Sequence, residues 1–201
     1  MSNSSSVLPF GESNIDNAMD TADHPVQNLS VVVRQQTFND AAEIDRLMGL
    51  GFSSSHSGRN IWRLREGEVL DELCLVAEAE AGHLLGSIRY WPITIADKPS
   101  ILLGPLAVDP AVRGRGIGVQ LVRQSLERAL SGPWHWCFIS GEPNYYLKFG
   151  FSPVTYEDVS LPAHIEEERL HMLALSSATP EDMPPKPWPV LSMHSFPKEA
   201  K

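Results

Sequence analysis

The sequence predicts a mixed α/β (α+β) domain in which a sheet carries helices on both of its faces. Apolar runs of strand type and apolar stripes at helical spacing alternate between residues 30 and 176. At 201 residues the chain is long enough for one domain with a sizeable core, and too short for two domains of ordinary size with a linker. We therefore expect one domain with two tails.

The two ends of the chain differ in composition from the middle. Residues 1–29 are rich in Ser, Asn and Asp without a sustained periodicity, which predicts a disordered tail. Residues 177–201 are dense in Pro, which predicts an extended or loosely docked arm that Trp188 and Phe196 could pin to the domain. The folded domain is accordingly expected over residues 30–176.

The first half of the domain is predicted to contain strands and short helices. A β-branched run indicates a strand over 29–38, and an apolar stripe after it indicates a helix that ends near Gly51. A second short helix is expected over 59–65. Two strands over 73–80 and 84–95 follow, joined by a turn.

The second half is predicted to alternate between strands and helices. The run 101–110 is too apolar for a strand with one wet face, so it is expected to be central in the sheet. An apolar stripe at helical spacing follows and ends before Gly132-Pro133. The remaining elements are expected to be a strand over 134–140, a short helix over 143–149, and strands over 151–154 and 169–175.

Charge, hydropathy and cysteine content exclude several classes of function. The net charge of -9 disfavours nucleic acid as a partner, and no apolar run reaches the roughly 18 residues that a membrane span needs. Cys74 and Cys137 lie in apolar stretches and the His residues are scattered, so reduced thiols and no metal site are expected. The first thirty residues lack a secretory-signal pattern, so we expect a cytoplasmic protein.

The most informative stretch is LGPLAVDPAVRGRGIGVQLV, in which a buried strand, a glycine-rich turn and a helix follow one another. Gly114, Gly116 and Gly118 leave backbone N–H groups uncovered at the helix start. Arg113 and Arg115 add positive charge there, so a diphosphate is the expected ligand. The Gly-Lys-Ser/Thr of a phosphate loop is missing, and the G-x-G-x-G spacing differs from the G-x-G-x-x-G of dinucleotide folds.

Two segments resemble motifs of the GNAT acetyltransferases. The segment 108–118 resembles motif A, and GEPNYYLKFGF at 141–151 is similar to motif B. The likeness covers most of residues 31–175, leaves out both tails, and points to the bacterial branch often called YhbS-like. It implies a GNAT-type acyl-CoA N-acyltransferase fold, whose mixed, mostly antiparallel sheet has a splayed central strand pair and helices on both faces.

The resemblance also implies which residues bind coenzyme A. Main-chain groups on the strand before the glycines would hold the pantetheine arm and the oxyanion that forms during transfer, and the glycine turn would hold the diphosphate. The strand residues are Leu106, Ala107 and Val108, and the turn residues are Arg113, Gly114, Arg115, Gly116, Ile117 and Gly118. Asn144 would bond the pantetheine or, equally, cap a helix.

Tyr146 matches the family tyrosine that can protonate the departing thiolate, because a phenol stays protonated at neutral pH. A core position for Tyr146, with Tyr145 facing the coenzyme, is the alternative. No general base carries over from the family. Glu78, His83 and Glu142 are local candidates, and loss of the amine proton to water is the other explanation.

The resemblance implies an N-acetyltransferase that moves the acetyl group of acetyl-CoA to a primary amine by direct attack in a ternary complex, without a metal. A covalent intermediate on Cys137 is disfavoured, because an apolar setting raises a thiol pKa. The acceptor is expected to be a small-molecule or peptide amine. Two alternatives stay open, a non-catalytic acyl-CoA-binding sensor module and a transferase with another acyl donor or acceptor. The oligomeric state also stays open, a homodimer included.

Overall fold

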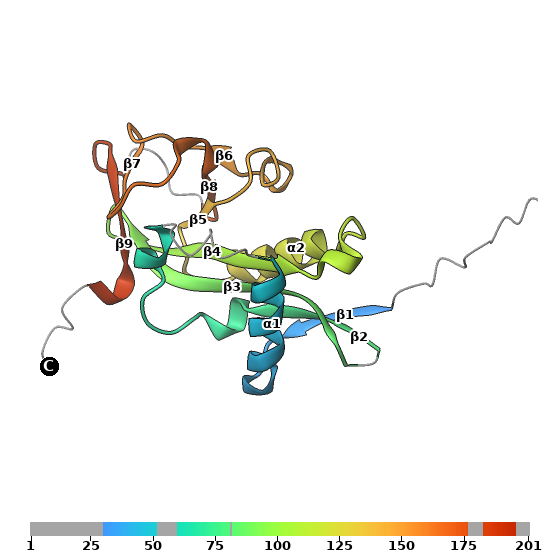
Figure 1. The fold of residues 1–201 in the computed structure, drawn as a ribbon. Helices are drawn as coiled ribbons and strands as arrows, with labels where there is room; N and C mark the ends of the chain where they lie inside the picture. The colour runs from blue at the N-terminus through green and yellow to red at the C-terminus, as the bar shows by residue number, and fades with distance from the viewer. Residues whose placement is uncertain (1–29, 52–59, 81, 177–182, 196–201) are drawn as a thin grey trace, which may run out of the picture.

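The computed structural model describes residues 30–51, 60–80, 82–176 and 183–195. The predicted N-terminal tail and Phe196 lie outside these residues. Figure 1 shows a twisted sheet through the middle of the molecule, with one helix in front of it and another behind. No helix among the described residues is long and apolar enough to cross a bilayer.

The strands form one sheet in the order β1-β2-β3-β4-β5-β8-β6. Neighbours in this order run antiparallel except for β4 and β5, which are parallel, so the sheet is mixed and mostly antiparallel as predicted. The bounds are β1 Val31–Gln35, β2 Leu75–Ala79, β3 Leu84–Ile95, β4 Lys98–Val108, β5 Trp136–Ser140, β6 Ser152–Pro153 and β8 Leu170–Ala174.

The helices α1 (Ala41–Gly51) and α2 (Ile117–Leu130) cover opposite faces of the sheet. Alternation along β2 shows this directly, because successive side chains of a strand point to opposite faces. Leu75 and Ala77 belong to the apolar cluster that contains the buried side of α2. Val76, between them, packs in the cluster that contains the buried side of α1. The predicted helices on both faces are confirmed.

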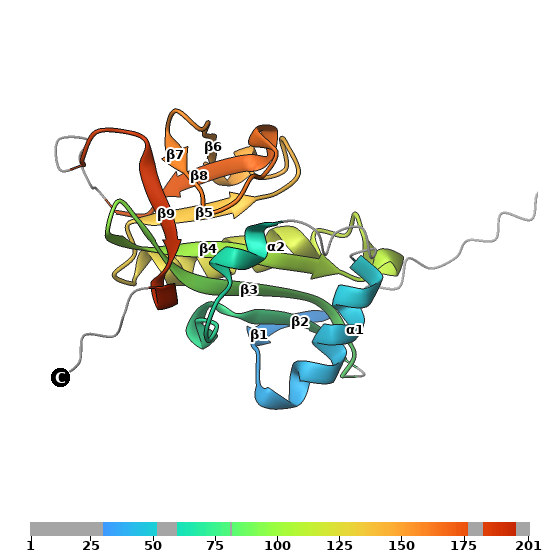
Figure 2. The same ribbon diagram turned by 60° about the vertical axis from the view of Figure 1, so that its left-hand side comes forward.

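The central strands β4 and β5 separate along their length (Figure 2). They pair only at Ile101 and Leu102, although β5 continues to Ser140 and β4 pairs with β3 as far as Val108. The sheet is therefore open between β4 and β5 beyond Leu102, which confirms the expected splayed pair.

A bulge in β4 lies at the point where the strands separate. Ile88 faces Leu106 and Tyr90 faces Leu103, so β4 advances three residues while β3 advances two. The extra residue falls at Gly104-Pro105, whose peptide bond is cis. Such a bulge bends the strand away from its neighbour.

A strand from the proline-rich segment joins the sheet, which the sequence did not predict. Strand β9 (Trp188–Ser192) pairs with β3 at Ile93–Ile95 and with the short β7 (Val159–Ser160). β3 extends beyond the end of β2, so its edge is free to accept another strand there. The Trp188 ring packs 5.6 Å from that of Trp136. The expected domain end at residue 176 thus leaves out a strand of the sheet, and the arm is paired rather than loosely docked.

The short helix expected over 143–149 is wrong in its first half. The structure has turns there and a single 3₁₀ turn over Leu147–Phe149. Asn144 has a φ of 70°, in the left-handed region that a right-handed helix cannot contain. The segment therefore changes direction before the 3₁₀ turn begins.

Candidate functional site

The glycine-rich turn connects β4 to α2 through a short capped 3₁₀ segment, Pro110–Val112. The Asp109 carboxylate accepts a hydrogen bond from the Ala111 N–H at 3.0 Å and another from Arg46 at 3.2 Å. These two bonds hold the pKa of Asp109 below its usual value, the bond from Ala111 being the larger cause. Asp109 thereby anchors the turn to the sheet and to α1.

Backbone donors are uncovered at the start of α2. Gly114 and Gly116 have φ values of 80° and 81°, and a Cβ atom on either would meet nothing within 4 Å. Gly116 is the N-cap and supplies no side chain to cap the helix. The first N–H groups of the helix, those of Ile117, Gly118 and Val119, have no acceptor within it. This arrangement can accept an anion.

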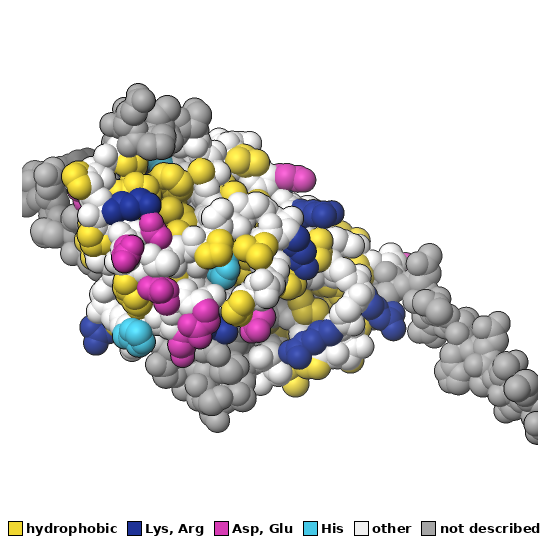
Figure 3. Space-filling view, turned by 90° about the horizontal axis from the view of Figure 1, so that it is seen from above, with side chains coloured by type: hydrophobic (Ala, Val, Ile, Leu, Met, Phe, Trp, Pro, Cys, Tyr) yellow, Lys and Arg dark blue, Asp and Glu magenta, His cyan; other side chains and the backbone are white. Residues whose placement is uncertain are grey.

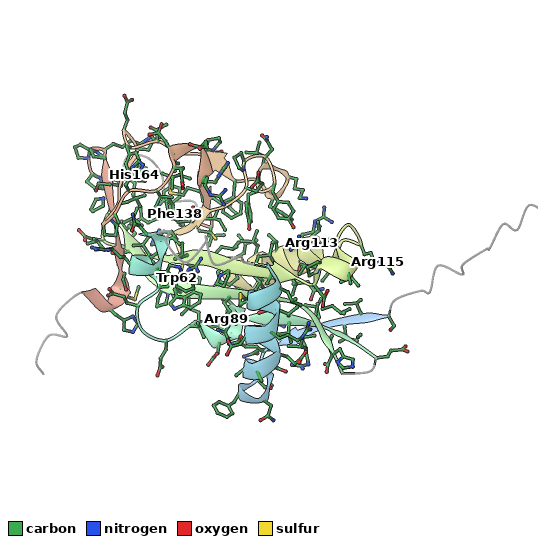
Figure 4. The ribbon with its side chains drawn as sticks, in the orientation of Figure 1. Trp62, Arg89, Arg113, Arg115, Phe138 and His164 are labelled. Carbon is green, nitrogen blue, oxygen red and sulfur yellow. The ribbon has the colours of Figure 1, made fainter. Side chains whose placement is uncertain are left out.

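The arginines of the turn are exposed at the same place. Neither the Arg113 nor the Arg115 side chain forms a hydrogen bond or ion pair with another residue that the structure describes. Figure 4 shows both at the beginning of α2. Figure 3 shows basic side chains at this end of the molecule, while most acidic side chains of that face lie over the other half. The turn therefore combines N–H donors, a helix dipole and free positive charge.

The remaining turn residues divide into those that face outward and those that face the core. The Ile117 side chain is buried in the α2 cluster, so only its main chain is available to a ligand. Gly118 lies against the motif B segment, because a Cβ atom there would be 2.8 Å from the Tyr145 hydroxyl and 3.5 Å from Val108. The glycine turn, β4 and the motif B segment thus meet around Gly118.

The register between β4 and β3 determines which main-chain groups of β4 are not hydrogen-bonded to β3. Asp109 donates its N–H to the Leu85 carbonyl, which makes these two a hydrogen-bonded pair. Hydrogen-bonded and non-bonded pairs alternate along antiparallel strands. The N–H and C=O groups of Leu106 and Val108 therefore point away from β3 toward the opening, whereas those of Ala107 point toward β3. The Ala107 side chain is buried beneath α1, so Ala107 contributes packing at this site.

The two tyrosines of motif B occupy different environments. Tyr146 is 6% exposed and packs edge-on against Tyr145 and Phe151 in the α2 cluster. Burial raises the Tyr146 pKa above its ordinary value. Tyr145 is half-buried, and its hydroxyl lies beside Gly118. A core position for Tyr146 and a location of Tyr145 beside the glycine turn were both alternatives that the sequence left open.

Asn144 does not cap a helix. It is exposed, it makes no side-chain hydrogen bond among the described residues, and Tyr146 is the residue that precedes the 3₁₀ turn. Its position on the turn before the tyrosines leaves its amide open to solvent. Contact with a ligand therefore remains a prediction for this side chain.

The candidate general bases are engaged or exposed. Glu78 accepts a 2.6 Å hydrogen bond from Arg34 on β1. His83 is exposed in the turn after β2. Glu142 is 78% exposed and lies 3.6 Å from Arg169. None of these three side chains is buried at the opening between β4 and β5.

The thiols are buried, as expected. Burial raises the pKa of Cys137 above its ordinary value and that of Cys74 to about 12. Neither thiol is activated as a nucleophile. The described residues contain no group of three or more His, Cys, Asp or Glu that could hold a metal ion.

Two arginines near Tyr146 were missed by the sequence analysis. The positive charges of Arg169 and Arg65 both act on the Tyr146 phenol and oppose the rise of its pKa. The Nη2 atom of Arg65 lies 3.4 Å from the position of a Cβ on Gly104, and Ile139 of β5 lies 3.8 Å from that position. Arg65 is thus beside the bulge. Nothing in the sequence distinguishes Arg65 from Arg63, because only the tertiary fold brings it to this opening.

Comparisons with known proteins agree with this geometry. Residues 70–153 match the family model described as an acetyltransferase (GNAT) domain. The chain is 30% identical over 131 residues to the N-acetyltransferase YhbS of Escherichia coli K12, covering 64% of this chain and 78% of YhbS. It is also 29% identical over 151 residues to the N-acetyltransferase YjhQ of the same strain, covering 72% of this chain and 83% of YjhQ.

Solved structures are similar as well. The structure of E. coli YhbS in complex with CoA superposes with a TM-score of 0.68 at 24% identity, covering 82% of this chain and 90% of that one. A GNAT family acetyltransferase from Brucella melitensis in complex with acetyl-CoA gives a TM-score of 0.58 at 29% identity, covering 79% and 94%. The fold is therefore shared with proteins that have been crystallised with the coenzyme.

Proposed function

Since the chain belongs to the GNAT N-acetyltransferase family, we propose that it moves the acetyl group of acetyl-CoA to a primary amine by direct attack in a ternary complex. The acceptor is a small-molecule or peptide amine, and the enzyme acts in the cytoplasm without nucleic acid or metal. The uncovered N–H groups at the start of α2 are the observation that carries the proposal.

The turn suits the diphosphate of coenzyme A. The main-chain N–H groups of Gly114, Gly116 and Gly118, together with that of Ile117, would donate to its oxygens. The guanidinium groups of Arg113 and Arg115 are exposed beside them and would neutralise its charge. Because Gly114 and Gly116 have open space where a side chain would stand, a phosphate can approach the backbone closely.

The opening between β4 and β5 suits the thioester end. The main-chain groups of Leu106 and Val108 point into it and can pair with an extended arm, and Asn144 can reach the same arm from the turn after β5. Acetyl-CoA supplies an acetyl group already activated as a thioester. A main-chain N–H at this position would also stabilise the negative charge that develops on the carbonyl oxygen.

The protonation states of Tyr146 and Cys137 favour direct transfer. The Tyr146 phenol keeps its proton at neutral pH and can donate it to the thiolate that leaves. The Cys137 thiol is buried with a raised pKa, which argues against a covalent acetyl-enzyme. With Glu78 paired and Glu142 exposed, the amine loses its proton to water, and positioning supplies much of the rate.

Two measurements on the full chain test this function. Calorimetry with acetyl-CoA should show binding, and a panel of primary amines should release free thiol from acetyl-CoA at saturating coenzyme. Tight binding with no thiol released by any amine would instead identify a non-catalytic coenzyme-binding module. Thiol release only with longer acyl-CoA donors would identify a different acyltransferase.

A further inference from the structure

Arg65 is a largely buried cation that has no ion pair with a residue that the structure describes. Its Nε atom is buried without a hydrogen-bond partner among the described residues. Its guanidinium group instead lies over two indole rings, 4.6 Å from the centroid of Trp62 and 5.5 Å from that of Trp91. Burial lowers the pKa of Arg65 to about 10, so it is still charged at neutral pH. An unpaired buried charge is costly unless a partner arrives with a ligand.

A paired arginine on β1 shows the difference. Arg34 donates to Asp40 at 2.8 and 2.9 Å and to Glu78 at 2.6 Å. Its hydrogen bonds to these two carboxylates raise its pKa, in contrast to Arg65. Arg34 therefore has a structural role that is complete within the chain. Arg65 carries a charge that no acidic side chain of the described residues pairs with.

Arg65 reaches the opening from the face opposite α2. The 3₁₀ helix Asn60–Leu64 packs through Leu64 with Trp91 and Leu102, whereas the neighbouring Tyr90 and Leu103 pack with α2. Figure 4 shows Trp62 well apart from Arg113 and Arg115 along the sheet. The guanidinium group thus lies away from the turn proposed for the diphosphate, beside Gly104 where the central strands separate.

A second arginine lies near the same opening. Arg169 precedes β8, and within the described part of the chain its Nε atom is buried without a hydrogen-bond partner and its only ion pair is the 3.6 Å contact with the exposed Glu142. Both arginines act electrostatically on the Tyr146 phenol. Two positive charges therefore act on Tyr146 although the whole chain carries a net charge of -9.

We propose that the acceptor is a small amino acid-like molecule, with a carboxylate beside its primary amine, and that Arg65 binds this carboxylate where β4 and β5 separate. The inference rests on the proposed function and specifies its acceptor. A guanidinium group presents a planar fork of donors that matches a carboxylate with two parallel hydrogen bonds. The indole rings of Trp62 and Trp91 hold the plane of that fork. Arg169 adds positive charge on the other side of the opening.

The first test uses the wild-type protein and matched acceptors. Alanine, serine, methionine, phenylalanine and β-alanine are each compared with their carboxamides, and kcat/KM is measured by thiol release from acetyl-CoA. We expect the acids to exceed the carboxamides by about ten- to hundredfold, the range of one charge-assisted hydrogen-bonded pair. The neighbouring carboxylate keeps an amine protonated, so intrinsic reactivity favours the carboxamides and opposes the expected order. Equal use of both would overturn the proposal.

The second test uses variants of the same helix. Arg65→Gln should remove the preference by lowering kcat/KM for the acids about tenfold or more beyond any change for the carboxamides, and Arg65→Lys should restore part of it. Arg63→Gln is the matched control, since it removes an exposed arginine two positions earlier and should alter neither class. The Kd of acetyl-CoA should be that of the wild type in all three variants, and a cooperative thermal unfolding transition shows that each variant is folded. If Arg65→Gln lowers both classes equally, Arg65 serves the thioester or Tyr146 instead, and the assignment is wrong.

Failure of the proposed function has a different signature. If no amine releases thiol, the transferase proposal fails, and calorimetry of the same amino acids on the CoA-bound protein decides about Arg65. Binding of the acids that Arg65→Gln abolishes would support the carboxylate site. Equal binding by wild type and variant, or no binding, would refute it.

Discussion

The start of α2 and the surroundings of Tyr146 are built from different kinds of chemical group. The first consists of main-chain N–H groups and exposed arginines within a short stretch of sequence. The second consists of buried side chains that come from distant segments, around Arg65, Tyr146 and Arg169. The diphosphate is common to every acyl-CoA, so a local motif is sufficient to bind it. Recognition of the acceptor and control of the proton need tertiary contacts.

The two regions also differ in how they tolerate change. The turn is solvent-exposed, and a Cβ atom at Gly114 or Gly116 would meet nothing within 4 Å, although the positive φ of both residues strains any side chain there. The Tyr146 ring is packed so closely on Gly141 that a Cβ atom there would collide with it. We therefore expect changes in the turn to act on coenzyme affinity, and changes around Tyr146 to act on turnover.

The largest expected effect is that of Tyr146→Phe on turnover. The variant keeps the packed ring and removes the proton donor, so kcat should fall by about 10²-fold or more, the usual contribution of a general acid. The Kd of acetyl-CoA by calorimetry should stay within about twofold, since no contact with the turn is lost. Tyr145→Phe is the comparison that tells which hydroxyl acts. Wild-type turnover in Tyr146→Phe, or a fall only in Tyr145→Phe, would reassign the role.

The next effect in size is that of Gly118→Leu on coenzyme binding. The new side chain would meet the Tyr145 hydroxyl and stand beside the free N–H groups. Loss of two charge-assisted hydrogen bonds corresponds to an affinity decrease of about 100-fold or more. Gly118 lies in a helix and is not in the left-handed region, so the backbone accepts leucine there, but the Tyr145 side chain must shift to admit the new Cβ atom. Thermal unfolding is measured beside the Kd to show that the variant is folded.

Gly49→Leu is the matched control for this glycine variant. Gly49 is an exposed residue of α1 with open space around its Cβ position. It should leave acetyl-CoA binding unchanged. An unchanged Kd in Gly118→Leu as well would place the diphosphate elsewhere and remove the contrast between the two regions.

The comparison explains what could be predicted from the sequence. The strand, the glycines and the helix from β4 to α2 are neighbours in the chain, so local rules were sufficient to locate them. Arg65 follows a short 3₁₀ helix and has the same local pattern as Arg63, and its importance depends on a bulge some forty residues later at Gly104-Pro105. Non-local contacts of this kind produce no periodicity or residue spacing in the sequence from which they could be predicted.

The same reasoning accounts for the errors in the fold. Strand β9 forms because β3 extends past β2 and leaves Ile93–Ile95 with a free edge. The segment 188–192 itself contains Pro189, which is compatible with an edge strand but argued for an arm when considered alone. For the site, the prediction that the Ala107 main chain faces a ligand did not take into account that hydrogen-bonded and non-bonded pairs alternate along β3 and β4. That alternation depends on the register between the two strands.

The smallest expected effect concerns the pH dependence of kcat, and it sharpens the contrast between the two regions most. We expect no alkaline decline in kcat below about pH 10, which is the ordinary pKa of a phenol. Burial favours the neutral form of Tyr146, so its pKa lies above that value, and the proton donor persists as pH rises through the range where a solvated tyrosine would begin to ionise. The profile should be measured at saturating acetyl-CoA with an acceptor whose amine is already unprotonated at pH 7, so that titration of the amine does not contribute. A decline with a midpoint clearly below 10 that disappears in Tyr146→Phe would mean that the phenol is hydrated and exposed in the working enzyme. The buried region would then resemble the open turn.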